Sequence, residues 1–209
     1  KGIPKDQAKI LVCEGNFHGR TISIVSMSTD PDSQGGFGPF TPGFEVIPYD
    51  DLPALEQALA DPNVCAFLVE PIQGEKGVYT PSAEYIPKAI AACKAKNVLF
   101  IADEIQTGIA RTGRMLASCL HTGCACANGQ CENRNRSVRP DVVILAKALS
   151  GGMYPVSAVL ADHEVMDVFT PGTHGSTYGG NPMGARLAIE ALDIVRDERL
   201  SENADRLGR

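Results

Sequence analysis

The stretch VVILAKALSGG (Val142–Gly152) joins an apolar run to a lysine and then to a small, glycine-rich segment. Its four apolar residues, Val142–Leu145, predict a strand of the kind found in parallel sheets that are covered on both faces. Stripping water from the ammonium group of Lys147 is costly unless something compensates. One interpretation is that the strand ends at Leu145 and that the lysine points into water, as most lysines do.

The residues after Lys147 favour a second interpretation. Ala-Leu-Ser-Gly-Gly (148–152) is small and turn-forming, so it leaves room for another molecule to approach the backbone. A lysine at the end of a buried strand, beside such a turn, can hold a carbonyl compound as a Schiff base. That role requires a less hydrated amine whose pKa is lowered by its surroundings.

Short apolar runs alternate with helical patterns along the rest of the chain. Strands are expected at Ile10–Cys13, Cys65–Val69, Val98–Ala102, Val142–Leu145 and Ser157–Ala161. Helices are expected at Leu52–Ala60, with Asp51 as N-cap and Pro53 in the first turn, and at Tyr85–Lys96 and Met183–Arg196. This alternation predicts an α/β fold with a mainly parallel central sheet and helices on both faces. Ligands of such sheets lie beyond the carboxyl ends of the strands.

The composition narrows the classes of partner. The chain has 209 residues, of which 44% are hydrophobic and 21% are charged, and this is typical of a globular protein. A formal net charge of −6 argues against a nucleic-acid groove and against binding to an anionic membrane surface. No apolar run approaches the length of a membrane span. We therefore expect neither nucleic acid nor a membrane as a partner.

The seven cysteines fall into two groups. Cys13, Cys65 and Cys93 stand singly in apolar stretches and are expected to be buried and reduced. An odd number of cysteines in a chain of this length favours a reducing compartment, either the cytoplasm or the mitochondrial matrix.

The other four cysteines crowd into one loop within residues 115–139. They are Cys119, Cys124, Cys126 and Cys131, with spacings of four, one and four residues. Zinc sites prefer pairs that are separated by two to four residues, so the match is imperfect. An exposed loop with free thiols ranks first, a redox pair second and a metal site third.

A second polar residue follows an apolar strand. The run LFIADE ends in Asp103 and Glu104, and a terminal aspartate is either a cap or the partner of a buried cation. Taken alone, the cap is the better interpretation. Beside Lys147, however, an aspartate could stabilise the protonated nitrogen of a pyridine ring bonded to that lysine. A lysine Schiff base with an acidic partner for the pyridinium is the signature of pyridoxal phosphate sites.

At this point the chain resembles the class III, fold-type I aminotransferases, which depend on pyridoxal 5'-phosphate. Six motifs carry the resemblance: NFHGRT (16–21), STDPDSQGGFGPFTPGF (28–44), VEPIQGE (69–75), FIADEIQTGIARTGR (100–114), AKALSGG (146–152) and HGSTYGGNP (174–182). It breaks only between Arg114 and Arg139, so residues 115–139 are interpreted as a cysteine-rich insertion. The resemblance implies that residues 1–209 are most of the cofactor-binding large domain. The family's N-terminal segment and C-terminal small domain would lie outside this chain.

The resemblance also implies roles toward the cofactor. Lys147 would be the Schiff-base lysine, and Asp103 would pair with the pyridine nitrogen. Gln106 would hydrogen-bond the phenolic oxygen, and Phe17 would cover one face of the ring, although a core aromatic is the simpler interpretation of Phe17 alone. The hydroxyl groups of Ser176 and Thr177 would reach the cofactor phosphate of a neighbouring subunit, in a homodimer with shared active sites.

Two further residues are implied to meet the substrate. Arg20 would clamp a carboxylate as a bidentate fork, although an ordinary surface charge is the alternative. Glu75 would pair with an arginine from a later segment when one substrate is bound and would release that arginine for the other. No metal is expected in this site.

The implied reaction moves the δ-amino group of L-ornithine to 2-oxoglutarate and gives glutamate 5-semialdehyde and glutamate. His18 departs from this pattern, since ornithine-specific members usually carry tryptophan there. Histidine is common in the wider class, so acetylornithine and 4-aminobutyrate remain alternative donors, and His18 could be only a packing residue. A relative that keeps the fold but binds no cofactor is the non-enzymatic alternative.

Overall fold

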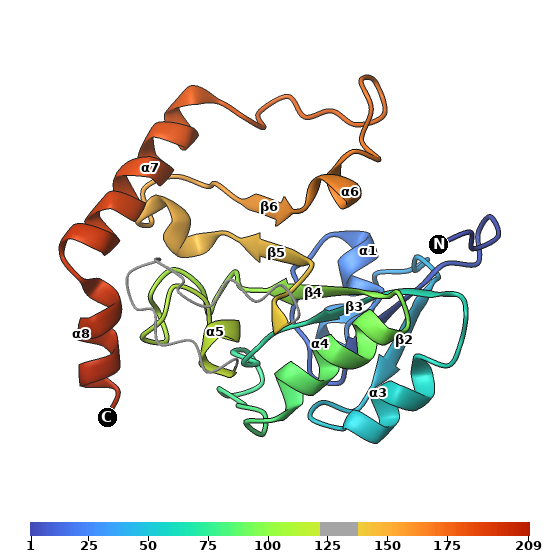
Figure 1. Cartoon of the computed structure of the whole chain (residues 1–209). Coiled ribbons are helices and arrows are strands. Elements are labelled where there is room, and N and C mark those ends of the chain that lie inside the picture. Colours follow the sequence, from blue (N-terminus) through green and yellow to red (C-terminus); the bar gives the residue numbers. More distant parts are fainter. Residues whose placement is uncertain (122–137) are drawn as a thin grey trace. The chain divides into compact units, whose positions relative to one another are not determined.

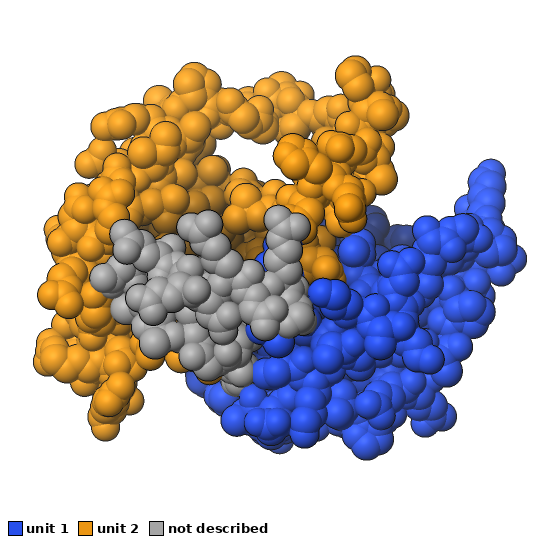
Figure 2. Space-filling model, viewed as in Figure 1, with its two compact units in different colours: residues 1–103, 135–140 blue, residues 104–134, 141–209 orange. Residues whose placement is uncertain are grey.

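A computed structural model describes residues 1–121 and 138–209 (Figure 1). For residue 121 it describes only the backbone. The described residues form two compact units, coloured separately in Figure 2. Unit 1 comprises residues 1–103 and 138–140, and unit 2 comprises residues 104–121 and 141–209.

Unit 1 is built on four strands that follow one another in the order β2-β1-β3-β4. Their bounds are β1 Lys9–Cys13, β2 Phe44–Ile47, β3 Val64–Val69 and β4 Leu99–Asp103. Each neighbouring pair is parallel, so all four strands end at the same edge. β1 and β3 have few polar residues because both are almost completely buried from Leu11 and Ala66 onward.

Two helices cover one face of these strands. In α3 (Leu52–Ala58), the Asp51 carboxylate accepts the N–H of Ala54 at 2.9 Å and Pro53 lies in the first turn, as predicted. α4 (Tyr85–Ala95) buries the five side chains that its helical spacing places on one side: Tyr85, Ile86, Ala89, Ile90 and Cys93. Two single-turn helices, α1 (Ile22–Val25) and α2 (Pro31–Gln34), follow β1.

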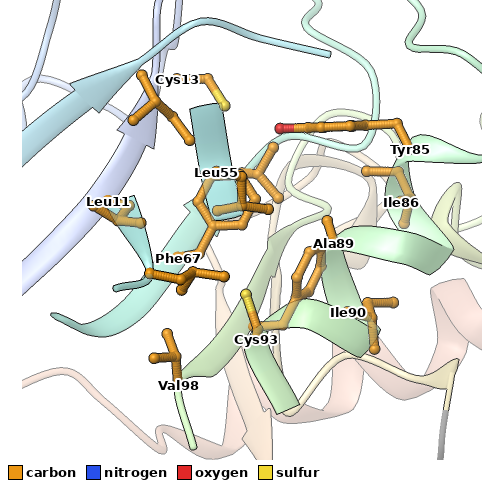
Figure 3. Packing of buried hydrophobic residues seen from close by; sticks show 14 of the residues in the cluster. Leu11, Cys13, Leu55, Phe67, Tyr85, Ile86, Ala89, Ile90, Cys93 and Val98 are labelled. Carbon is orange, nitrogen blue, oxygen red and sulfur yellow. The ribbon is translucent and has the colours of Figure 1, made fainter. Parts of the chain in front are cut away.

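The core of unit 1 lies between these two helices and the strands (Figure 3). Phe67 of β3 and Phe100 of β4 are partners in the register, and their rings meet edge to face with centroids 5.7 Å apart. Leu55 of α3 and Ile86 of α4 are fully buried in the same cluster. This packing fixes the strands and therefore the edge at which they end.

Unit 2 contains the antiparallel strands β5 (Val142–Leu145) and β6 (Ala158–Ala161). Its helices are α5 Ser118–His121, the 3-10 helix η2 Lys147–Ser150, α6 His163–Met166, α7 Pro182–Asp197 and α8 Leu200–Leu207. Three parallel strand pairs and one antiparallel pair within the two units agree with the predicted mainly parallel sheet.

The predicted strands and helices are confirmed to within two residues at each end. β2, α8 and the single-turn helices were not predicted from the sequence. Cys13 and Cys93 are buried and are not in disulfide bonds, as expected. Cys65 is only half-buried; it lies near the start of β3, and its thiol donates to the carbonyl oxygen of Lys9. In the cysteine loop, Cys119 is half-buried and forms no disulfide with another described cysteine, while Cys124, Cys126 and Cys131 lie outside the described residues.

Candidate functional site

The carboxyl edge of the strands in unit 1 gathers residues that are distant in sequence. β1, β3 and β4 are parallel neighbours, so the segments that follow Cys13, Val69 and Asp103 meet there. The first of these segments carries Phe17, His18 and Arg20, and the second carries Glu70 and Glu75. This is the edge at which open α/β sheets bind their ligands.

At this edge, His18 is hydrogen-bonded to Asp103. Nδ1 of His18 lies 2.7 Å from Oδ2 of Asp103, and the two side chains are only 2% and 6% exposed. A carboxylate only accepts hydrogen bonds, so Nδ1 carries the hydrogen. Nε2 of His18 is buried with no hydrogen-bond partner among the described residues. Asp103 is therefore a buried acid with a histidine partner.

A second buried carboxyl group, that of Glu70, fixes the backbone beside this pair. Its Oε1 accepts the N–H of Phe17 at 2.9 Å, and the residue is 6% exposed. Burial raises the pKa of Glu70, since it removes water from the charged form, while the Phe17 N–H and the nearby His18 act in the opposite direction. The charge of Asp103 raises the pKa of Glu70 further. Glu70 thus anchors the segment that presents Phe17 and His18.

Phe17 and Arg20 lie against each other. The half-buried ring of Phe17 has the guanidinium carbon of Arg20 5.4 Å from its centroid. Arg20 is exposed and lines a cavity of about 350 Å³, together with Ile22, Val25, Ser33 and Phe37. A guanidinium beside an apolar wall can bind a carboxylate that carries an aliphatic chain.

Glu75 lies in the turn after β3. Gln73 and Tyr79 pair across this turn, and the Gln73 amide donates to the carbonyl oxygen of Glu14 at 2.8 Å. The turn is therefore tied to the end of β1, on the same edge as Phe17. Glu75 itself is exposed.

In unit 2, Lys147 is exposed, whereas the Schiff-base interpretation expected a poorly hydrated amine at the end of a buried strand. The physical reason is local, because β5 ends at Leu145 and the chain turns at Lys147 with a left-handed φ of 45°. Gly151 and Gly152 also have positive φ, and the predicted glycine-rich turn is thus present. Lys147 lines a cavity of about 510 Å³ with residues that include Tyr154.

Lys147 and Gln106 line a second cavity in unit 2, with a volume of about 890 Å³. Gln106 is exposed and belongs to a turn that Glu104 holds in place. The buried Glu104 carboxylate accepts the Thr107 hydroxyl at 2.5 Å and the N–H groups of Ala117 and Ser118 at 2.9 and 2.8 Å. These hydrogen bonds explain why a second acidic residue, Glu104, is buried directly after the end of β4.

Ser176 and Thr177 lie in the loop before α7, where residues 171–180 are all exposed. The Ser176 hydroxyl accepts the N–H of Gly179 at 2.9 Å, and Asn181 caps α7 by accepting the N–H of Gly184 at 2.8 Å. The hydrogen bond of Ser176 lies within its own loop, beside Thr177. Their predicted role toward a phosphate stays a prediction.

Two classes of site are not found in the part of the chain that the structure describes. Residues 1–121 and 138–209 contain no group of three or more histidine, cysteine or acidic side chains that could hold a metal ion. Within the same residues, none of the helices has both the length and the apolar character needed to cross a membrane.

Two features of this edge were not predicted from the sequence: the role of Glu70 and the hydrogen bond between His18 and Asp103. The signal for the second was present, since an aspartate that ends a fully apolar strand needs a partner. The sequence does not say which residue supplies that partner, because 85 positions separate the two.

The whole chain, residues 1–209, matches the protein family described as Aminotransferase class-III. The mitochondrial ornithine aminotransferase of Rattus norvegicus is 59% identical over 208 residues, and an ornithine aminotransferase of Plasmodium falciparum (isolate 3D7) is 54% identical over 208 residues. These matches cover 100% of this chain but 44% and 47% of the relatives. The chain thus spans about half the length of the curated relatives it matches.

Solved structures agree with this relationship. An ornithine aminotransferase from Toxoplasma gondii, crystallized in the presence of oxidized glutathione and with partial occupancy of PLP at its active site, superposes with a TM-score of 0.90 at 52% identity. That match covers 99% of this chain and 45% of the other. An acetylornithine aminotransferase from Elizabethkingia anophelis gives a TM-score of 0.77 at 49% identity, with coverages of 99% and 44%.

Proposed function

The chain belongs to the class-III aminotransferases, and from this premise we propose that it is most of the large domain of an enzyme that moves the δ-amino group of L-ornithine to 2-oxoglutarate. The products are glutamate 5-semialdehyde and glutamate. The observation that carries the chemistry is the buried Asp103 held by His18 at the carboxyl edge of the strands. The identity of the donor rests on the likeness to ornithine aminotransferases.

The residues present fit pyridoxal 5'-phosphate. When bound, this cofactor supplies an aldehyde that takes up the amino group and a protonated ring that accepts the electron pair left on the carbon. Lys147 and Gln106 line one cavity of about 890 Å³, which is large enough for such a molecule. Lys147 would bind the aldehyde carbon, Gln106 the phenolic oxygen and Asp103 the ring nitrogen, while Phe17 would cover one ring face.

Asp103 suits its role because burial makes its charge effective. A carboxylate that is 6% exposed interacts with a neighbouring positive charge far more strongly than one in water. The hydrogen bond between His18 and Oδ2 fixes the carboxyl group that would hold the ring nitrogen in this proposal. A negative charge at this position would favour the protonated ring that the cofactor needs to accept electrons.

Lys147 acts twice in this proposal. Besides holding the aldehyde carbon, the Lys147 amine would take the proton from the substrate δ-carbon as a general base and then donate it as a general acid to the cofactor carbon that held the aldehyde. The short, glycine-rich turn after Lys147 gives its side chain room to serve in both roles. Arg20 holds a substrate carboxylate away from the reacting carbon and so fixes which amino group reacts.

Glu75 would distinguish the two substrates. It pairs with an arginine outside this chain while ornithine is bound and releases that arginine for the second carboxylate of 2-oxoglutarate. The exposed position of Glu75 in the turn after β3 supports such an exchange of partners. Without it, one pocket could not accept two substrates that differ in charge.

The remaining parts of the proposal concern assembly and compartment. Ser176 and Thr177 would bind the cofactor phosphate of the partner subunit in a homodimer, and residues 115–139 form an insertion that the reaction does not use. The enzyme would work in the cytoplasm or the mitochondrial matrix, and the name of the rat relative supports the second. Sedimentation of the full-length protein tests the dimer, since a monomer with full activity would exclude the shared site.

An amino-donor screen of the full-length protein tests the proposed reaction. Ornithine, N-acetylornithine and 4-aminobutyrate are compared by kcat/KM with 2-oxoglutarate as acceptor, and ornithine is expected to be preferred. N-acetylornithine is the second candidate, because an acetylornithine aminotransferase is 49% identical in sequence. Absence of visible cofactor absorbance, and of a borohydride-fixed adduct at Lys147, would instead favour a cofactor-free relative.

A further inference from the structure

The glycine- and proline-rich loop at residues 28–42 has no part in the chemistry above, yet its first turn contacts Arg20. Nη1 of Arg20 donates a hydrogen bond to Oγ of Ser33 at 3.2 Å. The Ser33 hydroxyl in turn donates to Oδ2 of Asp30 at 2.5 Å. A substrate-facing cation is thus joined to a carboxylate through one hydroxyl. We call Asp30 and Ser33 the Arg20 bracket.

The bracket is itself held in place. Oδ1 of Asp30 caps α2 by accepting the N–H of Asp32 at 3.0 Å, and Thr29 accepts the N–H of Gly15 at 2.8 Å. The Gln34 amide donates to the carbonyl oxygens of Ser28 and Val25 at 2.7 and 3.3 Å. Ser33 is only 5% exposed. The acceptor for Arg20 is therefore a fixed, buried oxygen rather than a mobile surface group.

The polarity of the bracket is also determined. The pKa of the Asp30 carboxyl is lowered, first by the Ser33 hydroxyl, then by the Asp32 N–H, and also by the charge of Arg20. An ionised Asp30 can only accept, so the Ser33 hydroxyl must donate to it and present its lone pair to Arg20. Hydrogen bonds in such a chain polarise one another, which makes Ser33 a better acceptor.

The other side of Arg20 is open to a ligand. Its guanidinium has five N–H donors, and the ring of Phe17 lies 5.4 Å from its central carbon. The group is exposed and lines the cavity of about 350 Å³, whose other walls include Ile22, Val25 and Phe37. One N–H is thus used for positioning, while the others can form a fork toward a carboxylate.

We propose that Asp30 and Ser33 are positioning residues that hold the guanidinium of Arg20 for the carboxylate of the substrate. The proposal rests on the proposed function for the identity of that substrate, but carboxylate binding itself needs no turnover. Arginine has considerable rotamer freedom, and a side chain that is fixed before binding loses less entropy when the ligand arrives. The bracket should therefore tighten binding and leave the chemical step unchanged.

Calorimetric titration of the full-length, cofactor-loaded protein with glutarate tests the proposal without any reaction, since glutarate lacks the keto group of 2-oxoglutarate. Ser33→Ala removes the acceptor, and Asp30→Asn keeps the α2 cap but removes the charge that orients Ser33. Because a single hydrogen bond is at stake, the Kd for glutarate should rise roughly three- to tenfold in both variants. Asp32→Asn removes the same charge two positions farther along the chain than Asp30 and should leave the Kd unchanged.

A kinetic comparison adds a second readout. In Ser33→Ala, the KM for ornithine should rise by a similar factor with kcat nearly unchanged, while kcat/KM for 1,4-diaminobutane, which has no carboxylate, should stay at the wild-type value. An unchanged Kd for glutarate in Ser33→Ala, equal losses with the diamine, or no binding of glutarate by the wild type would overturn the proposal. Weakened glutarate binding in a protein that fails to turn over ornithine would support the bracket and refute the proposed function.

Discussion

Nδ1 of His18 lies 2.7 Å from Oδ2 of Asp103, although 85 positions separate the two residues in the chain. His18 follows the first strand and Asp103 ends the fourth, and the parallel pairing of β1, β3 and β4 brings them to one edge. The contact with His18 orients the buried carboxylate of Asp103. The charge of Asp103 is therefore the first property to test.

Replacing Asp103 by asparagine or alanine should lower kcat roughly 100-fold or more, because a neutral partner no longer stabilises charge on the cofactor ring. Asparagine keeps the shape of the side chain and the contact with His18. The decrease in kcat of the asparagine variant therefore measures the effect of the charge alone. Single-turnover kinetics of the full-length variants give the rate of the chemical step. A rate within a few-fold of wild type would mean that Asp103 serves only the fold.

Lys147→Ala should abolish transamination and the visible absorbance of the bound cofactor, because it removes the covalent anchor and the proton carrier together. The fold should survive, since Lys147 is exposed and lies outside the buried core. Circular dichroism and thermal unfolding verify the second point. Turnover by this variant at the wild-type rate would refute the central assignment.

Glu75→Ala should slow the half-reaction with ornithine roughly tenfold or more, because the unmasked arginine would attract the wrong substrate charge. The half-reaction with 2-oxoglutarate needs that arginine free and should change much less. Stopped-flow measurement of each half-reaction separates the two effects. Equal losses in both directions would make Glu75 a structural residue of its turn.

Glu70→Gln should change how stability depends on pH. Burial raises the pKa of Glu70 above its ordinary value of 4.5, so the folded protein keeps this proton to higher pH than the unfolded chain does. Its contribution to stability is full below that ordinary value and is lost as pH rises through the raised pKa. Glutamine keeps an acceptor for the Phe17 N–H but does not titrate. The free energy of unfolding of the variant, minus that of the wild type, should therefore increase from acidic to neutral pH. Urea denaturation at several pH values measures this difference. A difference that stays constant with pH would contradict the raised pKa of Glu70.

The cysteine loop should be dispensable. Replacing Cys119, Cys124, Cys126 and Cys131 together by serine should leave activity and zinc content unchanged, because free thiols rank first among the interpretations of that loop. Cys13 provides an internal reference, since burial raises its pKa to about 12 and so keeps it unreactive toward alkylating agents at neutral pH. Stoichiometric zinc that is lost in the serine variant would reverse the ranking.

Local sequence determined most of the secondary structure. The apolar runs at β1, β3, β4 and β5, and the capped helix after Asp51, could be read directly because strand burial and helix capping depend on neighbouring residues. β2 escaped prediction because Phe44–Ile47 contains Glu45 and directly follows the loop whose glycines and prolines dominate the pattern. The exposure of Lys147 also escaped, since it depends on a left-handed φ at a residue that is not glycine.

The sequence by itself determined the α/β class, the lysine with its glycine-rich turn and the aspartate that ends an apolar strand, since each of these is a local pattern. Only the tertiary structure decided which residues meet. It paired His18 with Asp103, placed Glu70 on the backbone of Phe17 and joined Arg20 to Asp30 through Ser33. Such contacts depend on the order and direction of the strands and on how a loop folds back, and no short-range pattern of residue types encodes these.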